Sequence, residues 1–476
     1  MRSLGVGLVY WAALDAILRH DGAEISVLEI EPQTLWEQTY GSGGWQYSAN
    51  EALFDRVASL PHSKLLHGVG QPLGGTVPDP IDPMPLLRDA VRRLAPAWIS
   101  EHLSFNRVQR DGHVEHVGFL LPPPQTTAAV RVATRNIDRF RHSLGRPVAF
   151  ETGVNYLRPN DSDISDGEFF SAVAEESNCG ILLDLHNLWC NERNGRQSVA
   201  EVLARLPLDR VWEIHVAGGM EESGYWIDAH SGAVPSEVLD IAAQIIPRLP
   251  NLGALVFEIL PEHLPGFGLA RVEQQIEVLH DLWKLRPPAV RRAHKDAYLP
   301  STRAADIAAD RVEVGRRETE LAELLRAGGG PAGESKASPV DPGVHLVRTL
   351  VADFRRATLA RALRFTLTAL LGGLGQRGAQ DLLDAYLEAY PPEPFGAVEA
   401  DRCASFLRTC LPRMPAIPFL EEVLSYEHAL VKAAIYGTSS EVRWSADPVR
   451  ILESLDHGEL PGALPVVSSS MIVCVG

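Results

Sequence analysis

Residues 1–285 alternate regularly between short apolar segments and longer amphipathic segments, and this alternation restricts the fold more than any other feature. Apolar segments rich in Val, Ile and Leu predict strands, and the 3.6-residue apolar period between them predicts helices. Several predicted strands are continuously apolar, which is typical of a parallel sheet covered by helices. The predicted strands are residues 4–10, 25–31, 64–70, 97–102, 147–152, 180–185, 210–217 and 254–260, and the clearest predicted helices are 84–94, 125–143, 166–177, 235–248 and 269–283.

Eight strand–helix units in about 280 residues match the usual size of a (β/α)8 TIM barrel. The competing fold is an open doubly wound sheet, which usually carries a Gly-x-Gly-x-x-Gly turn after a strand. No predicted strand is followed by this motif, and the glycines at 41–44 are expected in a long loop without a following helix. We therefore predict an α/β barrel over residues 1–285.

Charge and cysteine content exclude several classes of protein. The chain has 44 basic and 61 acidic residues, a net charge of -17, and so lacks the overall basic character of a nucleic-acid or membrane-surface binder. Five cysteines without metal-finger spacing argue against a disulfide scaffold. No uncharged apolar segment reaches the roughly 18 residues that span a bilayer. We expect a soluble, cytoplasmic protein.

Imidazole and carboxylate side chains end six consecutive predicted strands. In a TIM barrel the carboxyl ends of the strands carry the active site. Such side chains suit divalent first-row metals, and eight donors exceed the coordination number of one ion, which predicts two or more ions. Glu29 and Glu31 end the second strand and could face the same end, whereas His116 is expected to be structural. The predicted donors are His67, His102, Glu151, Asp184, His215 and Glu258, with Asp228 and His230 from the loop after the seventh strand.

Other chemistry remains open or is disfavoured at this point. A metal-dependent sugar isomerase or phosphodiesterase would place similar residues on the same barrel, and a non-catalytic peptide-binding scaffold is a third alternative. A Schiff-base enzyme needs a lysine near the active site, but Lys64 begins its strand at the opposite end. No Gly-x-Ser-x-Gly motif supplies a serine nucleophile.

The order of motifs resembles that of the multinuclear non-haem iron-dependent oxidative enzymes, a family that includes the catalytic subunit of methanobactin biosynthesis. The resemblance covers about residues 4–285. The matching blocks are 68–75 after His67, 100–103, 121–124, 182–187, 213–218, 227–231 and 257–258.

This resemblance implies a barrel similar to xylose isomerase that holds two or three iron ions in mixed Fe(II)/Fe(III) states, with O2 as co-substrate. It implies oxidative modification of a ribosomally made precursor peptide, usually at cysteine, in natural-product biosynthesis. The eight donors would be the iron ligands, and Asp184, His215 and Glu258 the catalytic residues. The chain departs from the family at Thr152, often Asn, and at His186, within a motif that is often Asp-x-Asn-Asn. His186 and Asn187 would support the ligands from behind, although His186 could be an additional ligand.

The C-terminal part of the chain differs in pattern. Residues 286–343 predict an exposed charged helix at 304–326 and a Gly/Pro/Ser linker. Residues 344–476 are mainly helical by period, and the segments 387–392, 403–407, 419–430 and 442–448 resemble the helical partner subunits of these iron enzymes. We therefore predict a fused peptide-presenting domain, with a dimerisation or stability domain as the alternative.

Overall fold

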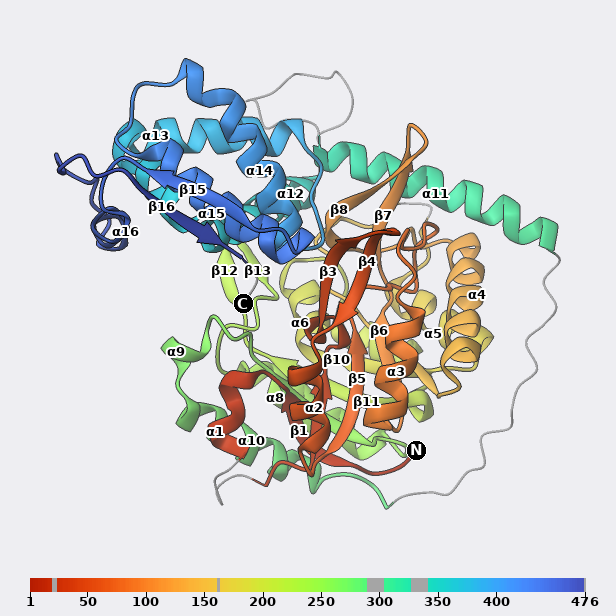
Figure 1. The fold of residues 1–476 in the computed structure, drawn as a ribbon. Coiled ribbons are helices and arrows are strands. Elements are labelled where there is room, and N and C mark those ends of the chain that lie inside the picture. Colours follow the sequence, from red (N-terminus) through yellow and green to blue (C-terminus); the bar gives the residue numbers. More distant parts are fainter. Residues whose placement is uncertain (19–23, 161–162, 289–303, 327–340, 475–476) are drawn as a thin grey trace.

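The first part of the chain forms a closed barrel of eight parallel strands (Figure 1). The computed structural model describes residues 1–18, 24–160, 163–288, 304–326 and 341–474. Around the barrel the order is β1-β14-β11-β10-β9-β6-β5-β2, and β14 pairs with β1 to close it. This confirms the predicted TIM barrel, and each barrel strand coincides with a predicted one. The strands are β1 (Gly5–Val9), β2 (Val27–Ile30), β5 (Ser63–Gly68), β6 (Ile99–His102), β9 (Val148–Glu151), β10 (Gly180–Asp184), β11 (Val211–Ala217) and β14 (Ala254–Glu258).

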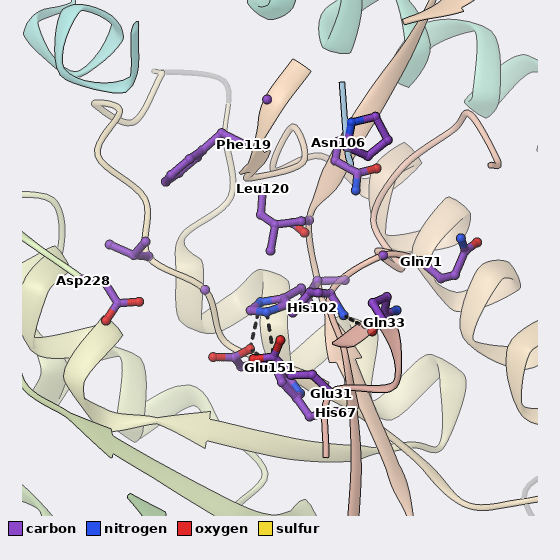
Figure 2. A pocket seen from close by; sticks show the side chains of 18 of the residues that line it. Glu31, Gln33, His67, Gln71, His102, Asn106, Phe119, Leu120, Glu151 and Asp228 are labelled. Atoms are coloured by element: carbon purple, nitrogen blue, oxygen red, sulfur yellow. Dashed lines mark hydrogen bonds and ion pairs between the residues drawn. The ribbon is translucent and has the colours of Figure 1, made fainter. Parts of the chain in front are cut away.

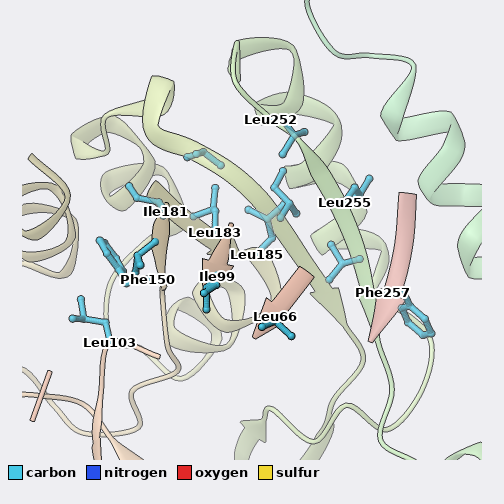
Figure 3. Packing of buried hydrophobic residues seen from close by; sticks show 14 of the residues in the cluster. Leu66, Ile99, Leu103, Phe150, Ile181, Leu183, Leu185, Leu252, Leu255 and Phe257 are labelled. Atoms are coloured by element: carbon cyan, nitrogen blue, oxygen red, sulfur yellow. The ribbon is translucent and has the colours of Figure 1, made fainter. Parts of the chain in front are cut away.

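Helices cover the outside of the barrel and bury the outward side chains of its strands. Figure 3 shows part of this packing, with Leu66, Ile99 and Phe150 among the buried residues. Local signals set several helix ends: Ser165 and Glu168, for example, form a capping box at the start of the helix at 166–177. The longer helices are α2 (Glu51–Ser59), α3 (Met84–Leu94), α4 (Thr127–Leu144), α5 (Asp166–Ser177), α6 (Leu185–Arg193), α7 (Val199–Arg205), α8 (Ser236–Ile245) and α10 (Leu269–Trp283), and the short ones are α1 (Asp15–Leu18) and α9 (Leu264–Phe267).

Three antiparallel hairpins interrupt the loops that follow the barrel strands. Asp111 and Gly112 turn the second hairpin with left-handed φ values of 47° and 81°, as a tight two-residue turn requires. The expectation of a long loop at 41–44 is wrong, because these residues turn the first hairpin. The hairpins are β3 (Trp36–Gly41) with β4 (Gly44–Ala49), β7 (Phe105–Arg110) with β8 (His113–Leu121), and β12 (Met220–Glu222) with β13 (Tyr225–Ile227).

Helix α11 (Ala304–Arg326) lies along the barrel against α4 and β7 (Figure 1). The predicted helix is present, but the expectation that it is exposed is wrong. Asp310, Val314 and Glu318 are buried on one face. Asp310 pairs with Arg131 of α4 at 2.6 Å, and Glu318 accepts hydrogen bonds from Thr76. The buried face could not be recognised from the sequence because two of its residues, Asp310 and Glu318, are acidic.

The C-terminal region is mainly helical, as predicted, and has a core of its own. Tyr386 and Trp444 are among its largest buried side chains. Among the described residues, none of the helices combines the length and the apolar character needed to cross a membrane. The elements are α12 (Pro342–Ala362), α13 (Arg364–Ala389), α14 (Gly396–Cys410), α15 (Leu420–Tyr436) and α16 (Pro448–Asp456), with an antiparallel pair β15 (Ser440–Trp444) and β16 (Ser469–Val473).

Candidate metal centre

Six of the donor side chains occupy inward positions at or near the carboxyl ends of their strands. Successive residues of a strand point to opposite faces. In β5, Leu66 packs against the helices while Leu65 and His67 point inward, and in β9 Phe150 packs outward while Glu151 points inward. Because parallel strands end at the same rim of the barrel, these inward residues meet at its carboxyl end.

A first cluster consists of His67, His102 and Glu151 (Figure 2). Glu151 Oε2 lies 3.2 Å from His67 Nε2 and 2.8 Å from His102 Nδ1. Ser100 Oγ donates to the Leu66 carbonyl and lies 3.0 Å from His67 Nδ1, so it can accept the proton on Nδ1 and leave Nε2 facing Glu151. Burial lowers the pKa of His67, but the Glu151 and Glu29 carboxylates outweigh it and raise this pKa to about 10. The position therefore favours positive charge, which a proton or a metal cation can supply.

A second cluster surrounds His215. Its Nε2 lies 2.9 Å from Glu29 Oε1 and its Nδ1 lies 3.1 Å from Glu258 Oε1. Asp184 is fully buried beside it, and ligand atoms of Asp184, His215 and Glu151 all lie within 4.8 Å of one another. Burial and the neighbouring carboxylates, first Asp228 and then Glu151, raise the pKa of Asp184 well above its usual range. A cation would relieve this repulsion between carboxylates.

Asp228 and His230 complete the donor set from the loop after β13. His230 Nε2 lies 3.0 Å from Asp228 Oδ1 and 3.4 Å from Glu258 Oε2, which joins this pair to the second cluster. His186 Nδ1 lies 2.8 Å from Asp228 Oδ1, and its Nε2 accepts a hydrogen bond from Trp226 Nε1 at 3.1 Å. Both ring nitrogens of His186 are thus engaged by other side chains.

Asn187 supports two donors from the first turn of α6. Its backbone N–H donates to Asp184 Oδ1 at 2.6 Å, so that Asp184 caps the helix. Its side-chain amide donates to Glu151 Oε1 at 3.3 Å. Asp184 Oδ2 has no hydrogen bond from the described residues, and Glu151 Oε2 faces the two imidazoles of His67 and His102.

The donor set fits bound metal ions. Glu258 Oε2, His230 Nε2 and both ring nitrogens of His215 also lie within ion-pair distance of other members of the site, but make no hydrogen bond of normal geometry with the described residues. Buried polar atoms without good hydrogen bonds are rare in native proteins, and at metal sites the ion satisfies them. Three groups of three donors bring their ligand atoms within 4.8 Å of one another. Nitrogen and oxygen donors without thiolates suit divalent first-row metals.

Six of the predicted donors line the floor of a cavity of about 800 Å³, namely His67, His102, Glu151, Asp228, His230 and Glu258, whereas Asp184 and His215 are fully buried beside them. Phe119 and Leu120 of β8 line it above His102 and Glu151 (Figure 2). Phe354 of α12 also lines it, so the C-terminal region contributes to the same cavity. Glu31 lines the floor, and burial raises the pKa of Glu31 to about 7.

The structure brings together all eight predicted donors, with His186 and Asn187 directly behind them. Glu29, left open by the sequence, points inward and touches His215. Side chains two residues apart on a strand point to the same face, so the inward direction of the apolar Val27 could have indicated that Glu29 also points inward. His116 lines the cavity, although it was expected to be structural. His116 lies in β8, and its position at the cavity was not expected because this hairpin was not predicted.

Solved structures similar to this chain include a xylose isomerase domain protein from Planctomyces limnophilus and a D-psicose 3-epimerase. The first has 16% identity and a TM-score of 0.37, and covers 60% of this chain and 97% of that chain. The second has 12% identity and a TM-score of 0.36, and covers 59% of this chain and 98% of that chain.

Sequence relatives are closer. A UPF0276 protein of Chromobacterium violaceum is 34% identical over 223 residues, which are 47% of this chain and 79% of that protein. A UPF0276 protein of Anaeromyxobacter is 34% identical over 246 residues, which are 51% of this chain and 83% of that protein. The model of the family described as "RiPP precursor modification enzyme MbnB/TglH/ChrH" matches residues 4–262, where RiPP denotes a ribosomally synthesised and post-translationally modified peptide. This chain, whose matched residues include all eight predicted donors, therefore belongs to that family of peptide-modifying enzymes.

Proposed function

We propose that this chain catalyses the iron- and O2-dependent oxidative modification of a ribosomally synthesised precursor peptide, at a cysteine residue. One observation carries the proposal: eight imidazole and carboxylate side chains converge in a member of a peptide-modifying family, and six of them line one cavity while Asp184 and His215 are buried beside these six. The cavity volume of about 800 Å³ lies in the range of ligand-binding pockets and is sufficient for a short peptide segment.

The proposed irons, two or three in number, would be held by the clusters described above. His67, His102 and Glu151 would form one group of ligands. His215 would belong to two further groups, one with Glu29 and Glu258 and one with Glu151 and Asp184. Asp228 and His230 would complete the set. Bound iron supplies one-electron redox chemistry with O2, which these side chains alone lack.

The remaining residues would orient these ligands and exclude water. Ser100 directs His67, Asn187 directs Asp184 and Glu151, and His186 directs Asp228. Such supporting hydrogen bonds hold metal ligands in the productive orientation. Phe119 and Leu120 cover the donors with apolar surface, which limits the access of water to the floor.

We further propose that residues 344–476 present the peptide to the barrel. Two contacts support this role. Helix α12 lies against β8 and contributes Phe354 to the cavity. The rings of Tyr40 and Trp45, at the tip of the β3–β4 hairpin, lie 5.8 and 6.1 Å from that of Tyr436 on α15. A peptide bound by the C-terminal region would thus be close to the barrel rim.

The proposal is tested on the full chain, loaded with ferrous iron without oxygen. We expect two or three irons per chain by elemental analysis. The probe peptide is the product of a short cysteine-containing reading frame adjacent to the gene, and we expect O2 uptake that depends on this peptide and a mass change at its cysteine. Asp184→Asn and His215→Ala should abolish both signals, whereas His263→Ala, outside the donor set, should not.

Two results would overturn the proposal. Activity with magnesium, manganese or zinc and without O2 would indicate an isomerase or phosphodiesterase on the same barrel. Tight peptide binding without any mass change, in iron-loaded enzyme with O2 present, would indicate a non-catalytic scaffold.

A further inference from the structure

Apolar side chains from two distant parts of the chain line the cavity. Phe119 and Leu120 come from β8, Leu350 and Phe354 from one face of α12, and Phe395 from the residue before α14; we call these five residues the apolar wall. Figure 2 shows Phe119 and Leu120 on the side of the cavity away from Glu151 and His67. The wall and the donor set therefore border the same space.

Close packing holds the C-terminal part of the apolar wall in place. A Cβ atom on Gly118, in β8, would lie 2.7 Å from Val351 Cγ1 and 2.8 Å from Pro392 Cγ, so α12 and the 392–396 segment approach β8 as closely as a glycine permits. The ring of Phe395 lies 5.5 Å from that of Tyr47. Tyr47 in turn donates to Asp79 at 2.8 Å, and this carboxylate is buried in an ion pair with Arg107.

Charged side chains beside the apolar wall are already paired. Arg355 Nη2 lies 2.7 Å from Glu399 Oε1, and both residues are buried. Arg402 pairs with Glu393. These groups are therefore not free to bind a charged ligand, so the wall offers mainly apolar contacts.

Phe354 stands out within the wall because 61% of its surface is exposed. Covering such a side chain removes apolar area from water and stabilises a complex. Large exposed apolar residues at the edge of a pocket often mark a binding surface.

We infer that the apolar wall binds an aromatic or large aliphatic side chain of the precursor peptide, directly beside the residue that is modified. This inference rests on the proposed function. The wall and the donors line one cavity of about 800 Å³, so the group on the wall and the group at the donors belong to one short segment of the peptide, and we assign them to adjacent residues. Residues of the C-terminal region, Phe354 above all, would thus determine which position of a peptide is modified.

The experiment uses the full chain, loaded with ferrous iron without oxygen and immobilised. The probe is a display library of short peptides with one fixed cysteine and random neighbours. We expect the wild type to enrich Phe, Tyr, Trp, Leu or Ile directly beside the cysteine, and Phe354→Ser to lose this preference. Leu371→Ser is the matched control, because Leu371 is an equally apolar residue of the same region, 50% exposed and outside the cavity.

A second measurement uses one enriched peptide with a fluorescent label. We expect Phe354→Ser to raise its Kd about tenfold, as the loss of one apolar contact surface predicts, and Leu371→Ser to leave it unchanged. Circular dichroism checks that each variant is folded. A wild type that enriches no apolar neighbour, or a Phe354→Ser variant with the wild-type preference, overturns the inference.

A parallel library with alanine in place of the fixed cysteine separates this inference from the proposed function. If the apolar preference and its loss in Phe354→Ser persist there, while no cysteine peptide is ever oxidised, the wall inference stands and the proposed reaction fails. If cysteine peptides are oxidised but Phe354→Ser selects as the wild type does, the reaction stands and the wall inference fails.

Discussion

Single polar side chains set the direction of several donors, namely His67, Glu151, Asp184 and Asp228. Ser100 is the clearest case, because its hydroxyl lies 3.0 Å from His67 Nδ1 and is fully buried. Without this partner the imidazole can rotate or change tautomer. Its Nε2 would then no longer face Glu151 consistently.

We expect Ser100→Ala to weaken iron binding by about tenfold, the lower end of the effect of removing a hydrogen bond to a metal ligand. The measurement is an anaerobic titration with ferrous iron, followed by elemental analysis. Ser177→Ala is the control, because Ser177 is equally buried but its hydroxyl donates to the Val173 carbonyl in α5 and not to a predicted metal ligand. Equal affinities in the two variants would contradict the role assigned to Ser100.

His186 distinguishes a supporting residue from an additional ligand. Because its nitrogens contact Asp228 and Trp226, we expect His186→Asn to bind as many irons at saturation as the wild type, with about tenfold lower affinity. His215→Ala should lose iron even at saturation. Loss of one iron in His186→Asn would show instead that His186 is a ligand.

The sequence could place six of the predicted donors at one rim because each lies at or near the end of an apolar strand, and the structure brings these six side chains together. It left Glu29 undecided, since Glu29 and Glu31 both end the predicted second strand, and the structure shows that Glu29 reaches His215. It gave no indication of Phe354, because contact between α12 and β8 joins residues more than two hundred positions apart.

At the scale of elements, the apolar period predicted α3, α5 and α10 to the residue. The hairpins were missed because their strands are half exposed and their turns lie within long loops. Helix α11 was placed correctly, but its buried face was not, since Asp310 and Glu318 become satisfied only by partners from the barrel.

Helix α11 should make stability depend on pH through Glu318. Burial raises the pKa of Glu318 to about 7, from an ordinary value of 4.5. Between these values the folded chain holds a proton that the unfolded chain releases, so this group's contribution to the free energy of unfolding falls as pH rises. Glu318→Gln should remove this pH dependence. As the pH rises from 4.5 to 7, the free energy of unfolding of the variant should increase by roughly 2–3 kcal/mol relative to that of the wild type.

Urea denaturation across this pH range measures the difference. Glu323→Gln is the control, because Glu323 is an exposed residue of the same helix. A constant difference between Glu318→Gln and the wild type at all pH values would contradict the prediction.

At the scale of the whole molecule, Gly118 controls how closely the C-terminal region packs on the barrel. Gly118→Ala would push a methyl group into Val351 and Pro392, and we expect about 1–3 kcal/mol of destabilisation from overpacking. Gly112→Ala is a closely matched control, since Gly112 has the same φ of 81° in the same hairpin but no atom within 4 Å of its Cβ position.

Because both glycines have the same φ, alanine adds the same backbone strain at each position. The difference between the free energies of unfolding of the two variants, measured by chemical denaturation, therefore reports the steric effect. Gly118→Ala should be the less stable, and its peptide binding should weaken as α12 moves away from β8. Equal stability of the two variants would show that Val351 and Pro392 do not pack against Gly118 as described.

The pairing of the first barrel strand with the last also has a consequence during synthesis. Because β1 pairs with β14, the barrel cannot close on the ribosome until the nascent chain has been extended beyond Glu258. Leu350, Phe354 and Phe395 emerge only afterwards. Donors from opposite sides of the barrel would therefore meet before the cavity is covered, which leaves an interval in which small ions could enter a newly made molecule without obstruction.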